Sequence, residues 1–239
     1  MRKQFIFFVL ILFMLGFASC DDGRIYEETI YVPREGRVLK FTGKISGIDN
    51  WTDGYSVVLG GFDAKSEYAV VAKNIQKTAA DDDEIQVVMS GISEEVTQIE
   101  LCVINQIRKR VVTFQTMTDI ADASDTIRMD AGTVDVGMYS AIQQQVFNKS
   151  CTACHGGSTT PAAGLYLLES NSYASLVNQA STIVEGQMRV NPGNAQESTL
   201  HLILSTNLSS GWGIDHSDMI TSPAVLSLVK DWIDNGAKQ

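Results

Sequence analysis

The chain of 239 residues is 44% apolar and 8% aromatic, and its mean hydropathy is +0.02. This composition is typical of a globular protein and excludes a largely disordered chain, while a single apolar run of near-membrane length excludes a polytopic membrane protein. Because 18 Lys and Arg stand against 28 Asp and Glu, the net charge is −10, which argues against nucleic acid as a partner.

The first 19 residues have the pattern of an export signal. Arg2 and Lys3 precede an apolar run from Phe5 to Phe17, which is shorter than the ~20 residues of a membrane-spanning helix. The segment from Phe17 to Cys20 then resembles a bacterial lipobox, in which a peptidase cuts before a cysteine that carries acyl chains. The resemblance implies a lipoprotein signal peptide at residues 1–19, lipidation of Cys20 and a tether at residues 20–25. It places the chain in the cell envelope, anchored on the periplasmic side or at the outer-membrane surface. The alternative is a plain secretory signal with an incidental cysteine.

The pattern of residues 26–118 predicts a β-sandwich. Short β-branched or aromatic runs alternate with turn signals such as Thr52-Asp53-Gly54 and Ser90-Gly91. These runs predict strands at residues 26–32, 38–41, 55–59, 68–71, 85–89, 96–104 and 111–116. The number and length of the strands resemble an immunoglobulin or fibronectin type III domain. Cys102, which lies in one of the strands, is expected to be a buried and inert thiol.

The pattern changes after this segment. Residues 119–136 are small, acidic and weakly patterned, and we interpret them as a linker. Apolar residues then recur with helical spacing, which predicts helices at residues 140–149, 172–178 and 197–206 and a last one from Pro223 to the Asn235-Gly236 stop. The sequence therefore predicts a multidomain chain, with an all-β sandwich followed by an all-α domain at residues 137–239.

The strongest motif is Cys151-Thr152-Ala153-Cys154-His155, the C-x-x-C-H pattern of covalent haem attachment. Two cysteines with this spacing near a helix end can face the two vinyl groups of one haem, and the next residue can place its imidazole under the iron. With four Cys and three His in the chain, a chance match is expected roughly one time in a thousand. The alternatives are a zinc site, a redox dithiol and a disulfide. Zinc needs four convergent ligands, and a thioredoxin-like dithiol follows a strand rather than a helix.

From about Ser140 to Lys238 the sequence resembles the class I c-type cytochromes. The resemblance rests on the haem motif, the helix before it, Gly156-Gly157 after it, and the segments 164–167, 190–194, 198–200 and 232–237. It implies an all-α cytochrome c domain with one covalent haem c held by Cys151 and Cys154. His155 would be the proximal iron ligand, and a methionine nearer the C-terminus would be the distal one.

Met219 is the distal ligand that the resemblance favours, because it lies in the loop before the last helix. His216, three residues earlier, is the alternative and would give iron with two histidine ligands, while His201 is a weaker candidate. The choice matters because a thioether raises the reduction potential and a second imidazole lowers it.

These features lead to three functional hypotheses. The leading one is a membrane-tethered monohaem c-type cytochrome, which passes single electrons to or from a redox partner protein and is not a catalyst. The alternative is a surface-binding lipoprotein whose β-sandwich recognises a glycan or an envelope protein, with the haem domain as an accessory. A haem peroxidase is the least favoured, because it needs an open coordination position on the iron.

Overall fold

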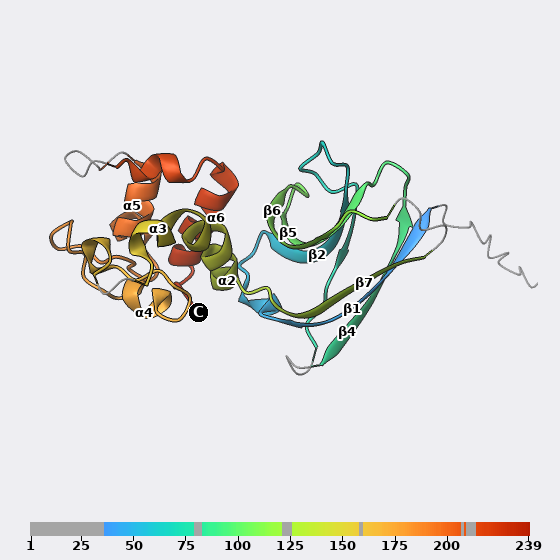
Figure 1. Ribbon diagram of the computed structural model, residues 1–239, viewed down its shortest axis with the longest axis horizontal. Coiled ribbons are helices and arrows are strands. Elements are labelled where there is room, and N and C mark those ends of the chain that lie inside the picture. The colour runs from blue at the N-terminus through green and yellow to red at the C-terminus, as the bar shows by residue number, and fades with distance from the viewer. Residues whose placement is uncertain (1–35, 79–82, 121–125, 158–159, 207, 209–213) are drawn as a thin grey trace, which may run out of the picture. The chain divides into compact units, whose positions relative to one another are not determined.

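The computed structural model describes residues 36–78, 83–120, 126–157, 160–206, 208 and 214–239. Within these residues, seven strands form two sheets (Figure 1). The first sheet has the order β4-β1-β7 and the second the order β3-β2-β5-β6. Strand β7 pairs parallel to β1, whereas all the other pairs are antiparallel. The bounds are β1 (Arg37–Ser46), β2 (Tyr55–Phe62), β3 (Val71–Asn74), β4 (Glu84–Ile92), β5 (Gln98–Asn105), β6 (Arg110–Met117) and β7 (Thr126–Asp135).

Burial along the strands follows the alternation of side chains. In β1, Leu39, Phe41, Gly43 and Ile45 are buried, and the alternate residues Lys40, Thr42 and Lys44 are more exposed. Strand β5 is buried on both faces, because Ile99, Leu101 and Val103 join the main core while Cys102 and Ile104 pack in a second cluster. Cys102 is fully buried, and this burial raises the pKa of its thiol, so the residue is the inert thiol expected from the sequence.

The expected linker contains regular structure. Residues 126–135 form β7, whose Ile127 and Met129 are buried beside β1. The junction after β7 is also held in place, because Val136 is fully buried and its carbonyl accepts a hydrogen bond from the Trp51 indole at 2.7 Å. The strand predicted at residues 26–32, the signal segment and Cys20 lie outside the described residues.

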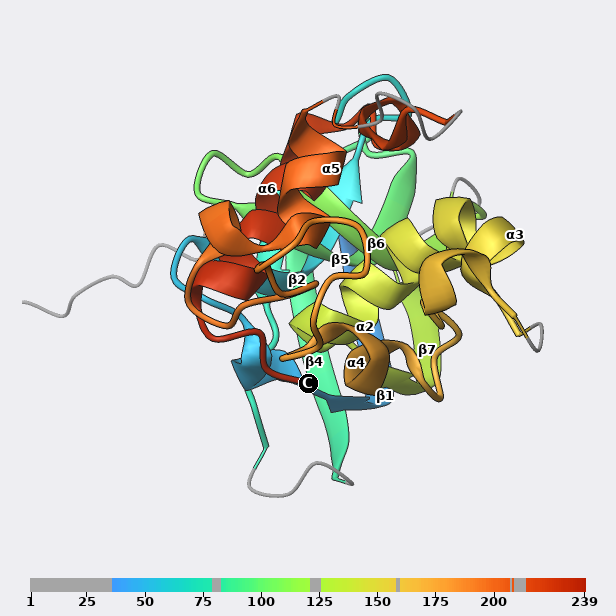
Figure 2. The same cartoon turned by 90° about the vertical axis from the view of Figure 1, so that its left-hand side faces the viewer.

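The helices follow β7. Figure 2 views them from the front, with α3 at one side and α5 and α6 at the other. None of the helices within the described residues has the length and apolar character needed to cross a membrane. The α-helices are α2 (Met138–Ile142), α3 (Thr152–His155), α4 (Ser172–Leu176), α5 (Thr199–Ser205) and α6 (Pro223–Asp234), η3 (Gln143–Cys151) is a π-helix, and the 3-10 turns are η2 (Ile48–Asn50), η4 (Ala162–Gly164), η5 (Ala195–Glu197) and η6 (His216–Met219).

One apolar core joins the sheets to the helices. Its fully buried members include Leu101 of β5, Phe147 of η3 and Val229 of α6. A polar contact reinforces this junction, since the Tyr55 hydroxyl at the start of β2 donates a hydrogen bond to Asp231 Oδ2 of α6 at 2.7 Å. Arg34–Gln239 accordingly form one compact unit.

The predicted fold class is therefore wrong. An all-α domain following an immunoglobulin-like sandwich would require the helices to enclose a core of their own, whereas these short helices share their core with the strands. The structure is instead a β-rich fold of two sheets with a small C-terminal helical region. The sequence pattern gave no sign that the helices share a core with strands far away in the chain.

This shared core predicts a single cooperative unit. Replacing the fully buried Ile142 of α2 with Ala is expected to lower the free energy of unfolding by roughly 2–5 kcal/mol, because it leaves a cavity in that core. Hydrogen–deuterium exchange should then accelerate in β5 as well as in the helices. Val88→Ala, at a side chain that is 57% exposed, is the control and should change stability by less than about 0.5 kcal/mol. Faster exchange confined to the helices would contradict the shared core.

Candidate functional site

The two cysteines of the C-x-x-C-H motif lie at the end of a continuous helical segment. Segments α2, η3 and α3 follow one another without an extended residue between them. Val146 and Phe147 of η3 are fully buried and fix this segment to the core. The wide π-helical winding brings the Cys151 thiol within 3.6 Å of the Val146 carbonyl, five residues earlier. π-helical segments occur frequently at functional sites.

The two thiols differ in their surroundings. Cys151 is half-buried against the core, and this burial, with a smaller contribution from Cys154, raises its pKa to about 11. Cys154 is exposed, and neither cysteine forms a disulfide. One helical turn therefore carries two free thiols near the surface, where a reactant can reach them.

A backbone carbonyl of the following loop orients the His155 ring. Its Nδ1 lies 3.0 Å from the carbonyl oxygen of Ala162, and we assign a proton to that nitrogen because a carbonyl can only accept. Burial is the main influence on the pKa of His155 and lowers it, although the bond to Ala162 acts in the opposite direction. A neutral imidazole with Nδ1–H bonded to a carbonyl leaves the Nε2 lone pair for a metal.

His216 faces the same region from another part of the chain. It begins η6, and its ring centroid lies 6.3 Å from that of His155, with 40° between the ring planes. The Ser150 hydroxyl donates a hydrogen bond to the Met219 carbonyl at 3.5 Å, so the other end of η6 lies beside the start of the motif. The structure therefore brings the two imidazoles together, while the Met219 side chain is 41% exposed.

One exposed apolar side chain, Leu168, lies beside the motif. A Cβ on Gly157 would lie 2.7 Å from Leu168 Cδ1, which places this exposed leucine against the residues that follow His155. Six of the nine large apolar side chains that are exposed among the described residues lie between residues 168 and 219, namely Leu168, Ile183, Met188, Leu208, Ile214 and Met219.

The sequence did not indicate two of these features. The Ala162 carbonyl is a backbone group, so no residue type signals its role. Leu168 is one of many leucines, and only the fold places it beside the motif. The Cys151-Cys154-His155 grouping, by contrast, is visible in the sequence because its members lie on one turn.

Comparisons with known proteins give no family for this chain. It matches no protein-family model, no curated protein and no solved structure. Among the described residues, moreover, no three His, Cys, Asp or Glu side chains come together as a group that could hold a metal ion. Within that part of the chain, the paired thiols therefore lack the further side-chain ligands that a zinc site requires.

The resemblance to the class I c-type cytochromes is corrected by these findings. No cytochrome family model matches, and the helices belong to a β-rich fold rather than to an all-α haem domain with an immunoglobulin-like neighbour. Short motifs such as Trp232–Ala237 supported the resemblance, but a helix end followed by Asn-Gly occurs in many unrelated folds.

His201, the weaker candidate for a distal ligand, is a buried side chain. It lies on α5, is only 7% exposed, and its buried Nδ1 has no hydrogen-bond partner among the described residues. Burial lowers its pKa below the ordinary 6.5, and the charge of Lys230 lowers it further, although Asp234 opposes this.

This environment predicts a pH dependence of stability. Because the pKa of His201 is lower in the folded state, the unfolded chain takes up the proton first as the pH falls through about 6.5, and the folded state loses stability below that pH. Thermal unfolding of the wild type and of His201→Leu, measured from about pH 7.5 to about pH 5, should show a smaller fall in Tm for the variant. Equal falls for the two proteins would show that His201 is not the group responsible.

Proposed function

We propose that this chain carries one covalently attached haem and passes single electrons to and from a redox partner while tethered to a membrane. The observation that carries the proposal is the close approach of two imidazoles, His155 and His216, beside two free thiols with C-x-x-C-H spacing. The proposal concerns a haem on this β-rich fold and not membership of the class I c-type cytochromes.

The thiols would make the attachment. Each S–H adds across one vinyl group, so that sulfur bonds to the carbon next to the porphyrin ring and the proton goes to the terminal carbon. No atom is lost and there is no net oxidation or reduction, so the mass of the chain rises by that of a whole haem. The exposed Cys154 and the half-buried Cys151 differ in accessibility, which favours reaction at Cys154 first.

Two histidines would supply the axial ligands. A metal–imidazole bond of about 2.0–2.1 Å on each side, together with the distance from each nitrogen to its ring centre, gives a centroid separation of about 6 Å. The observed 6.3 Å agrees with this value. Among the two distal ligands that the sequence left open, the geometry therefore supports His216 over Met219. A haem iron with two imidazole ligands supplies reversible one-electron chemistry at a lower potential than iron with a thioether ligand.

Residues of the chain would define the surroundings of the haem. The Ala162 carbonyl orients His155 and increases the electron donation of its ring, and Leu168 covers the surface next to the motif. With 28 acidic residues against 18 basic ones, the chain would attract a partner with a basic docking face.

The membrane tether rests on the lipobox-like segment that ends at Cys20. Several acyl chains on one residue anchor a protein stably, whereas a single chain does so only marginally. Loss of residues 1–19 also removes Arg2 and Lys3, which leaves 16 basic residues against 28 acidic ones and a net charge of −12. The anchored chain would therefore present a strongly acidic surface in the cell envelope.

Attachment can be tested by mass. Full-length protein produced in a bacterium with haem-attachment machinery is expected to gain the mass of one haem that survives denaturation. The double variant Cys151→Ala/Cys154→Ala should lose this mass completely, whereas Cys102→Ala, the matched control at a buried thiol, should keep it. Wild-type protein at the mass of the polypeptide and its lipid would refute the attachment.

The axial ligands can be tested by spectroscopy of the loaded protein. His216→Ala should open a coordination position, so that carbon monoxide shifts the Soret band of the reduced protein, while Met219→Ala should keep the wild-type spectrum. If instead Met219→Ala alone changes the spectrum and removes a near-infrared sulfur–iron band, Met219 is the ligand. Carbon monoxide binding to the wild type would favour chemistry at an open iron over electron transfer.

A further inference from the structure

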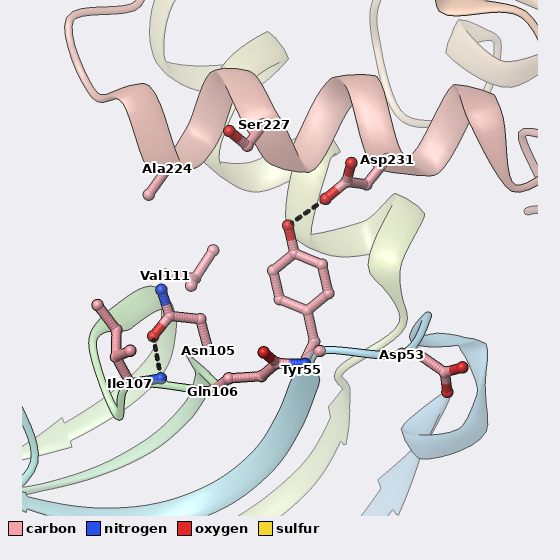
Figure 3. Close-up of a pocket in the computed structure, with 10 residues that line it drawn as sticks. Asp53, Tyr55, Asn105, Gln106, Ile107, Val111, Ala224, Ser227 and Asp231 are labelled. Carbon is pink, nitrogen blue, oxygen red and sulfur yellow. Dashed lines mark hydrogen bonds between the residues drawn. The ribbon is translucent and has the colours of Figure 1, made fainter.

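A cavity that includes no residue of the cysteine motif lies between the sheet of β2, β5 and β6 and helix α6. Its volume is about 420 Å³, which is within the range of small-molecule sites. Residues from three separate parts of the chain line it, and Figure 3 shows how they converge from the start of β2, the β5–β6 turn and α6.

Tyr55 forms a fixed aromatic wall of this cavity. Its ring packs against Trp51, with 5.5 Å between the centroids, and its hydroxyl donates a hydrogen bond to Asp231 Oδ2 at 2.7 Å. Burial, and then the bond to Asp231, raises the pKa of Tyr55, so the phenol stays protonated and remains the donor. Since one oxygen of Asp231 is occupied in this way, the second remains as an acceptor.

Asn105 presents a donor to the same space. Its side-chain oxygen accepts hydrogen bonds from the backbone N–H groups of Ile107 and Lys109, at 3.2 and 2.9 Å. These two donors fix the orientation of the amide, because a flipped side chain would place NH₂ against N–H. The NH₂ group is therefore turned away from the β5–β6 turn, toward Val111 (Figure 3).

This set of groups discriminates between classes of ligand. An anion would need a positive charge, and no Lys or Arg is among the described residues that line the cavity. A cation would need convergent acceptors, whereas Asn105 offers a donor and the Asp53 carboxylate points away from Asn105 (Figure 3). A neutral ring with adjacent hydroxyl groups can accept from Asn105, donate to Asp231 and lay an apolar face on Tyr55.

We propose that this cavity binds a neutral carbohydrate. The inference goes beyond electron transfer, because it uses none of the residues that would hold the haem. It adds a recognition function in which α6 and the sheet hold one sugar unit between Tyr55, Asn105 and Asp231. Ser227, which lies on α6 between Ala224 and Asp231, adds a hydroxyl that can donate or accept.

The test is a binding measurement on the full chain with neutral saccharides as probes. Glucose, galactose, mannose and N-acetylglucosamine, with their β-linked disaccharides, are titrated and followed by saturation-transfer NMR. At least one is expected to bind the wild type, and Asn105→Asp and Asp231→Asn are each expected to weaken it by about tenfold or more. Each substitution keeps the shape of the side chain and reverses the hydrogen-bonding role that faces the sugar.

Two further variants separate binding from folding. Ser227→Phe places a ring at the cavity from an exposed position on α6, where folding does not depend on the side chain, and should abolish binding. Glu94→Gln removes one negative charge from an exposed residue outside the cavity and should leave binding unchanged. The proposal is overturned if no saccharide binds the wild type, if Ser227→Phe binds as well as the wild type does, or if propylammonium binds and the saccharides do not.

Discussion

The shared apolar core is the constraint on which both candidate sites depend. Phe147 and Val229 pack in the same cluster as Leu101, so the helical segment that ends at the cysteine motif and helix α6 are fixed to the same sheets. This arrangement sets the surface from which Cys151, Cys154 and His155 project, and it also forms the open cavity beside Tyr55. A substitution that destabilises the core should therefore disturb both sites, although the two sites have no side chain in common.

Much of the secondary structure could be predicted from local pattern. The runs at residues 85–89 and 111–116 lie within β4 and β6, and the proline-started last helix corresponds to α6. Strand β7 was missed because its buried residues Ile127 and Met129 lie among charged and small ones, and its pairing with β1 is parallel and distant. Periodicity reports which face of an element is buried but not what covers it, so the shared core had no signal in the sequence.

The two candidate sites also differ in how far they could be predicted from the sequence. The cysteine motif is local, and the proposed haem attachment was predicted from five consecutive residues. The sequence favoured Met219 over His216 as the distal ligand, because the proximity of the two imidazoles depends on how η6 folds back onto the motif. Tyr55, Asn105 and Asp231 are far apart in the chain, and no spacing rule connects them. They come together only in the folded chain, where a hydrogen bond joins Tyr55 of β2 to Asp231 of α6 and the Asn105 amide is fixed at the β5–β6 turn.

The proposed electron transfer requires that His155 and His216 bind one iron. X-ray diffraction from crystals of the protein matured in a haem-attaching host, collected on both sides of the iron absorption edge, tests it most directly. We expect one anomalous iron peak between the Nε2 atoms of these two histidines, with continuous density from the porphyrin to both cysteine sulfurs. An iron peak bonded to Met219 sulfur would contradict the proposed ligand pair, and the absence of any iron peak would contradict the proposed function.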